Sequence, residues 1–143
     1  MTTAQNIIKA SLDSADFCIN GYLADLSDAD LMVRPAPGAN HLAWQLGHLI
    51  VSEHDLIEMV CPGSMPPLPD GFAPRYDKET AGSDDPNKFD KKETFLKLMK
   101  QQRAGTVAAL EKVTDNDLDR QSPEPIRDYA PTVGATFNLI GAH

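Results

Sequence analysis

The sequence has little of what would mark a secreted, membrane-embedded or nucleic-acid-binding protein. Its apolar runs fall well short of the ~20 residues that a membrane-spanning helix needs. The first residues lack the basic start and apolar block of a secretory signal, so we expect a cytoplasmic protein with no membrane partner. Thirteen basic against twenty-one acidic side chains give a formal charge of −8. That charge repels a phosphate backbone and argues against nucleic acid as a partner.

Cysteine and histidine are also scarce. The two cysteines, Cys18 and Cys61, have neither a zinc-type nor a redox spacing, and in a reducing compartment we expect both to be free thiols. Neither has a histidine or lysine at helical spacing that would activate it as a nucleophile. Of the four histidines, His48 and His143 lie in apolar surroundings, where packing alone explains a histidine poorly.

What is present is a length and a pattern suited to one helical domain. The 143 residues, 41% of them hydrophobic, suffice for one hydrophobic core. No segment shows the alternation that is typical of a strand, and helices are predicted over about 3–24, 40–60, 90–112 and from about 132 onward. We therefore expect a single all-α domain over residues 1–143, a four-helix bundle of two helical hairpins with a long crossover loop.

Local signals define the ends and faces of these helices. Asn40 and Asp90 are the expected N-caps of the second and third helices. Apolar residues recur at helical spacing along the first helix and predict its buried stripe, which comprises Ile8, Leu12, Ala15, Ile19 and Tyr22.

Two kinds of connection join the predicted helices. The segment between Cys61 and Asp90, which includes Arg75 and Tyr76, carries six of the eleven prolines, and we expect no regular element in it. It is either a lid over a pocket or a solvated connector. Ser27 and Thr114 each begin a Ser/Thr-Asp-x-Asp-Leu turn, and both turns are predicted to cap a short helix.

The four histidines differ in what their positions allow. His48 is flanked by apolar turns, and its structural interpretation is a core imidazole bonded to a backbone carbonyl, to Gln45 or to Ser52. His41 lies on nearly the same face but about 10 Å further along the helix, too far to bind the same metal ion. We expect it near the rim of the site. His54 is rotated by about 120° from His48 and is predicted to be a surface residue.

The residues from Pro35 to Leu49, Pro-x-Pro-Gly-x-Asn-x-x-Ala-Trp-Gln-x-Gly-His-Leu, resemble the DinB/YfiT-like superfamily of bacterial four-helix bundles. The resemblance implies a divalent metal, commonly nickel or zinc, held by one histidine of the second helix and a His-x-x-x-His pair on the fourth. His48 matches the first ligand and His143 the first member of the pair. The other histidine would lie four residues after His143, so we expect either that the chain continues or that the site is degenerate.

Three imidazoles would leave an open coordination position, as in catalytic metal sites. The resemblance implies thiol-dependent S-transferases and related hydrolases or isomerases, which activate a low-molecular-weight thiol on the metal and act on a small-molecule substrate. In such a site Gln45 or Ser52 would orient the His48 imidazole, and Trp44 would form a wall of the pocket. Trp44 has a plainer interpretation as a core anchor. The alternative function is a noncatalytic helical bundle that lacks the metal and could be a homodimer.

Overall fold

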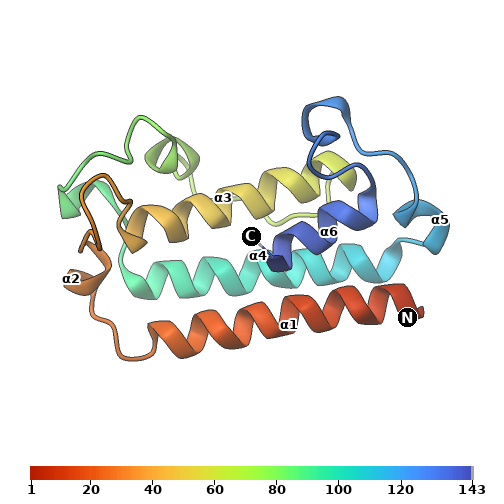
Figure 1. Cartoon of the computed structure of the whole chain (residues 1–143), viewed down its shortest axis with the longest axis horizontal. Helices are drawn as coiled ribbons and strands as arrows, with labels where there is room; N and C mark the ends of the chain where they lie inside the picture. The colour runs from red at the N-terminus through yellow and green to blue at the C-terminus, as the bar shows by residue number, and fades with distance from the viewer. Residues whose placement is uncertain (143) are drawn as a thin grey trace.

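The computed structural model describes residues 1–142, and it is built from helices joined by loops (Figure 1). Four long helices form its body: α1 (Thr3–Leu23), α3 (Leu42–Val60), α4 (Lys92–Lys112) and α6 (Val133–Ala142). Short helices stand in the connections, namely α2 (Asp28–Leu31), α5 (Asp115–Leu118) and the 3-10 helices η1 (Ala73–Tyr76), η2 (Pro86–Lys88) and η3 (Glu124–Ile126). Residues 1–142 contain no strand, which confirms the all-α prediction. None of these helices is long and apolar enough to cross a membrane.

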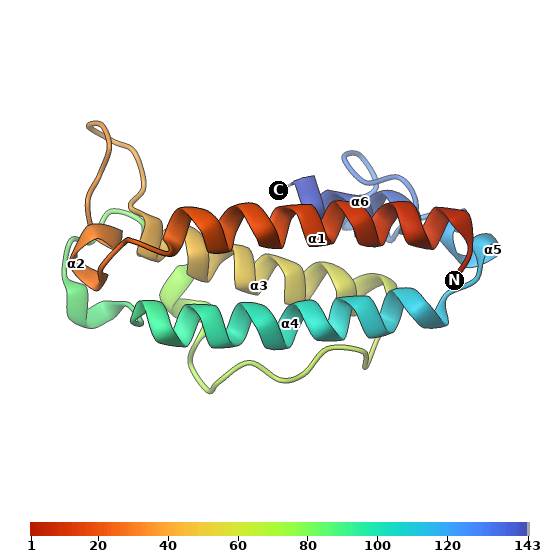
Figure 2. The ribbon, with the colours of Figure 1, turned by 90° about the horizontal axis from the view of Figure 1, so that it is seen from below.

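The long helices close into a four-helix bundle. α1 packs against α6 and α4, while α3 packs against α4 and α6, so each long helix contacts two others. Seen from below, α1, α3 and α4 run the length of the bundle, and α6 covers only part of it (Figure 2). Helix α3, the second long helix, therefore has partners on two sides. This explains why Gln45 is the one exposed residue between Leu42 and Val51.

Side-chain caps explain where several helices begin. Thr2 and Gln5 form a capping box at the start of α1. Gln5 is also buried, and its amide donates to the backbone oxygens of Leu110 (2.7 Å) and Val113 (2.6 Å), which fastens the end of α4 to α1. The two predicted turns after α1 and α4 are confirmed, since Ser27 caps α2 and α5 has an equivalent capping box.

Some sequence-based expectations about helix ends and faces are wrong. The N-cap of α3 is His41 rather than Asn40, because the His41 ring accepts from the backbone N–H of Trp44. The N-cap of α4 is Lys91, since the Asp90 carboxylate is engaged by Arg75 and Tyr76 instead. In α1 the last position of the buried stripe belongs to Leu23, because Tyr22 is 79% exposed.

The proline-rich segment between Cys61 and Asp90 is predicted to lack regular elements, but it contains η1 and η2. Together with Lys91 it joins α3 to α4, and we call this connection the segment 61–91. Each 3-10 helix has a proline in its first turn, where the missing N–H costs no hydrogen bond. The 3-10 helix η1 packs on α3, so the segment is attached to the bundle. The segment is attached to α3 through η1, while many of its other residues, including 77–79 and 84–88, are exposed as expected of a solvated connector.

The apolar core consists of two clusters, one towards each end of the bundle. The first includes Leu12 of α1 and Leu56 of α3, and the second includes Leu23 of α1 and Ile50 of α3. On α4 the second cluster ends at Leu98, and the first begins at Ala109. The residues between the two clusters include charged side chains from three helices, namely Asp16, Glu53 and Arg103. A polar layer therefore crosses the middle of the bundle.

Candidate functional site

His48 lies in the middle of α3, half-buried, with its ring held against Trp44. The two rings are stacked, with centroids 4.7 Å apart and planes inclined by 9°. On the next turn, Ser52 Oγ lies 3.5 Å from His48 Nε2. The indole thus covers one face of the imidazole, and a hydroxyl stands beside one of its nitrogens.

Trp44 is itself fixed from outside the helix. Its indole Nε1–H donates to the backbone oxygen of Asp77 at 2.8 Å, which ties α3 to the segment 61–91. Gln45, the other residue expected to orient His48, is exposed and donates its amide to the backbone oxygen of Asn40 at 2.8 Å. Trp44 and Ser52 therefore lie beside His48, whereas the hydrogen bond of Gln45 is directed towards the start of α3.

His41 and His54 both differ from their expected settings. His41 is fully buried rather than at a rim, and its two ring nitrogens are both used: Nδ1 accepts from Trp44 N, and Nε2–H donates to Ser83 O at 2.9 Å. The ring is therefore neutral and has no lone pair left for a metal. His54 is half-buried rather than on the surface, because its Nδ1–H donates to Oε1 of the buried Gln102 at 3.0 Å.

The described residues include one member of the metal-ligand set that the sequence predicts. Within residues 1–142, no three His, Cys, Asp or Glu side chains come together in a way that could hold a metal ion. His48 offers one imidazole. Its expected partner His143 lies outside the described residues. The donor set that the sequence predicts therefore has one member in the described part of the chain.

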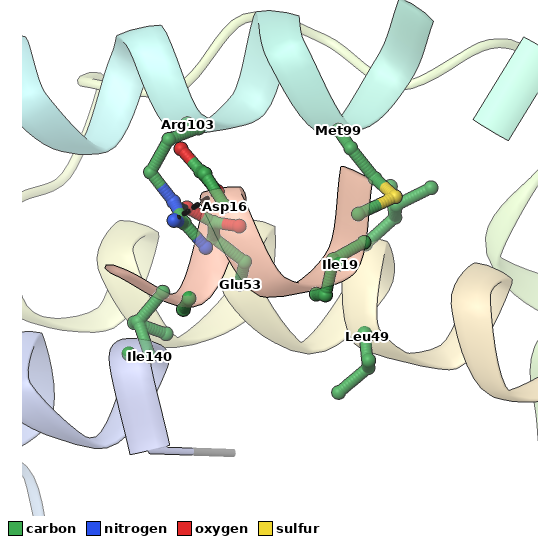
Figure 3. Close-up of a pocket in the computed structure, with 10 residues that line it drawn as sticks. Asp16, Ile19, Leu49, Glu53, Met99, Arg103 and Ile140 are labelled. Atoms are coloured by element: carbon green, nitrogen blue, oxygen red, sulfur yellow. Dashed lines mark hydrogen bonds and ion pairs between the residues drawn. The ribbon is translucent and has the colours of Figure 1, made fainter. Parts of the chain in front are cut away.

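A cavity of about 60 Å³ lies where α1, α3, α4 and α6 meet (Figure 3). We call it the central pocket; it is lined by Ala15, Asp16, Ile19, Leu49, Ile50, Glu53, Met99, Arg103, Ile140 and Gly141. Leu49 directly follows His48 in the sequence, and Gly141 lies two residues before His143. The described lining residues of this pocket come from the four long helices and include none from the segment 61–91.

The polar side of the central pocket is a charged cluster of Asp16, Glu53 and Arg103. Arg103 Nε donates to Glu53 Oε1 at 2.9 Å, and Arg103 Nη1 donates to Asp16 Oδ1 and to the backbone oxygen of Leu12. Thr106 Oγ also donates to Glu53 Oε1, at 2.7 Å. Burial raises the pKa of the Asp16 carboxyl; Arg103 opposes this rise, and the nearby Glu53 adds to it.

Sequence reasoning missed this cluster, because it followed the face of α3 that carries His48, and Glu53 does not lie on that face. A signal was present. Asp16 lies four residues after Leu12 on the buried stripe of α1, and Glu53 lies three residues after Ile50 and three before Leu56. A charged side chain at a position that helical periodicity assigns to the core indicates either a buried ion pair or a site.

Comparison with known families places most of the chain in a described family. The family model described as the DinB superfamily matches residues 19–143, which is most of the chain. No curated protein matches the chain, and no solved structure does.

Proposed function

The chain belongs to the DinB superfamily, and from this premise we propose that it is a divalent-metal-dependent enzyme in which the His48 imidazole is a metal ligand. His143 is the second proposed ligand, and nickel and zinc are the candidate metals. The observation that carries the proposal is the setting of His48. A histidine in the middle of α3 has its ring stacked on Trp44, and it occupies the position of the helix-two ligand in the resemblance.

The surroundings of His48 suit a ligand whose orientation is fixed in advance. The stack with Trp44 restricts rotation of the imidazole, and the bond from Trp44 to Asp77 restricts the indole in turn. Fixing a ligand before the metal arrives reduces the conformational entropy lost on binding, so such outer contacts strengthen metal affinity. When bound, a divalent metal would lower the pKa of a coordinated water or thiol.

Thiol-dependent S-transfer or hydrolysis of a small-molecule substrate is the reaction class proposed. The chain's own thiols are weak candidates for this chemistry. Burial raises the pKa of the Cys61 thiol, which disfavours its thiolate, and Cys18 is exposed on α1 without belonging to the central pocket. The thiol would therefore be a low-molecular-weight cofactor. An S-transferase would need this added thiol for activity, whereas a hydrolase would not.

Metal analysis of purified chain tests the proposal. We expect close to one divalent transition metal per chain in the wild type, none in His48→Ala, and wild-type content in the control His54→Gln. The control removes an imidazole from the same helix that already has a protein partner, Gln102. Unchanged metal content in His48→Ala would refute the site. Screening electrophilic substrates with and without added thiols then distinguishes transfer from hydrolysis.

A noncatalytic helical bundle is the second candidate function. It is favoured by the observation that residues 1–142 contain no group of three side chains that could hold a metal. On this alternative, added nickel or zinc neither binds stoichiometrically nor raises the midpoint of thermal unfolding. A saturable rise with either metal would exclude it, because a ligand that binds only the folded state stabilises that state.

A further inference from the structure

We propose that the central pocket binds the ammonium head of a small organic amine through the carboxylates of Glu53 and Asp16. The proposed amine site uses no histidine and needs no metal. The inference therefore goes beyond the proposed function, and it stands or falls separately from it.

The position of the charged cluster needs an explanation that stability does not provide. The cluster separates the two apolar clusters of the core, in a layer where apolar side chains from α1, α3 and α4 would pack directly. Replacing buried ion pairs by well-packed apolar residues is often neutral or stabilising, because the desolvation cost of the charges disappears. A charged layer that is largely buried at Glu53 and Arg103 and also lines a cavity is accordingly a candidate binding site.

The charges and hydrogen bonds of the cluster are unbalanced in favour of a cation. Two carboxylates face one guanidinium, so one negative charge is left over when both acids are ionised. Glu53 is only 8% exposed, and its Oε1 accepts from both Arg103 and Thr106. Its Oε2 and the Oδ2 of Asp16 accept no hydrogen bond from the described residues. These two oxygens can receive N–H donors from a ligand.

The raised pKa of Asp16 agrees with this imbalance. Burial is its largest cause, and repulsion from Glu53 adds to it even though Arg103 opposes both. A positive group placed between the two carboxylates would remove the repulsion and favour the ionised form of Asp16. One bound cation would relieve this repulsion at Asp16, whose side chain is 36% exposed and therefore accessible to a ligand.

The small volume of the pocket and the groove beside it favour a primary amine with a short apolar chain. About 60 Å³ is enough for a few waters or for one small head group, and apolar walls from Ile19, Met99 and Ile140 surround the polar side. A second hollow of about 350 Å³ shares Asp16 and Met99 with the pocket and continues along α1 and α4 to Asn20 and Lys100. An alkyl chain attached to the ammonium would leave the pocket along this groove.

Calorimetric titration with n-propylammonium chloride tests the proposal, using chain from which metal has been removed with a chelator. We expect saturable binding to the wild type and at least about tenfold weaker binding to Glu53→Gln. The matched control is Asp13→Asn, which removes an exposed carboxylate of the same helix that pairs with Lys9, and it should bind like the wild type. The neutral isostere n-propanol should not bind detectably.

A second variant keeps the test decisive if Glu53→Gln fails to fold. Met99→Trp leaves every charge in place and fills the pocket from its apolar wall, so it too should abolish binding of propylammonium. The proposal is overturned if the wild type shows no saturable binding, if both pocket variants bind as tightly as the wild type, or if propanol binds equally well. Since metal is absent throughout, none of these results depends on the role of His48.

Discussion

Tyr76 lies against the backbone of Gly47 so closely that a Cβ on Gly47 would be 2.1 Å from Tyr76 Cδ1. Tyr76 is held there by Asp90: its hydroxyl donates to Asp90 Oδ2 at 2.6 Å and accepts from Asp90 N at 2.8 Å. Because Gly47 immediately precedes His48, the segment 61–91 is fastened to α3 beside the candidate metal ligand. The glycine of the Gly-His pair is thus required by close packing rather than by a turn.

The contact between Gly47 and Tyr76 predicts that Gly47→Ala is strongly destabilising. A methyl group at this position cannot be accommodated without moving a fully buried ring, and such overpacking costs about 1–3 kcal/mol. The control is Gly21→Ala in α1, where a Cβ would meet nothing within 4 Å, and it should stabilise by about 0.5–1 kcal/mol. Urea denaturation measures both. Equal stability of Gly47→Ala and the wild type would contradict the packing described.

The charged cluster predicts a large cost for Arg103→Met. The substitution leaves Glu53 and Asp16 facing each other without a cation, and breaking a buried pair on one side costs about 3–5 kcal/mol. Lys9→Met is the matched control, because Lys9 pairs with Asp13 at the surface, where a pair contributes about 0–1 kcal/mol. If the two variants lose similar free energy of unfolding, the cluster is effectively solvated.

Two substitutions of Trp44 test whether its stack on the His48 ring contributes to metal binding. Trp44→Phe keeps a ring beside the imidazole but removes the indole hydrogen bond to Asp77 O, so stability should fall by about 1 kcal/mol with metal affinity nearly unchanged. Trp44→Ala removes the stack as well, and metal affinity should fall about 10–100-fold. Competition with a chelator of known affinity measures the difference. Similar metal affinity in both variants would show that the stack does not position His48.

The hydrogen bonds of Glu58 predict part of the loss of folding stability at acid pH. Its carboxylate accepts from the backbone N–H groups of Gly63 (2.9 Å) and Met65 (2.7 Å), and these bonds lower its pKa from the ordinary value of 4.5. The unfolded chain therefore binds more protons than the folded chain just below pH 4.5, so stability falls as the pH falls through this range.

The test is the pH dependence of Glu58→Gln. The stability difference between wild type and variant should be constant well above pH 4.5 and should shrink below it, as the wild-type carboxyl becomes protonated. Glu111→Gln, on the exposed side of α4, serves as the control for changes in net charge. Denaturation curves at several pH values measure the free energy of unfolding of both proteins. A stability difference that grows as the pH falls would contradict the lowered pKa of Glu58.

The helices could be predicted because their signals are local. Periodicity and proline define α1, α3, α4 and the start of α6 within the chain itself, and the paired turns at Ser27 and Thr114 are as expected. The settings of His41 and His54 could not be predicted this way. Each depends on a partner that is distant in sequence, Ser83 for one and Gln102 for the other.

The central pocket escaped prediction for the same reason. Helical geometry shows which residues share a face of one helix, but a cluster of Asp16, Glu53 and Arg103 requires three helices in a specific register. A comparison limited to the face of His48 necessarily excluded Glu53. The tight contact at Gly47 was equally hidden, since nothing near it in the sequence indicates the ring of Tyr76.

The four walls of the central pocket are not equally secured. Arg103 ties α4 to α3 and α1 by ion pairs, whereas α6 reaches the pocket through Ile140 and Gly141 and is held there by apolar burial and close packing on Ser11. A helix held in place without ion pairs to its neighbours opens at a lower free energy in local unfolding than helices that such pairs tie together. Amide hydrogens of α6 should therefore exchange with solvent before those of the other long helices. Each such opening would expose the interior of the pocket, so α6 provides a route for exchange between the charged layer and bulk water.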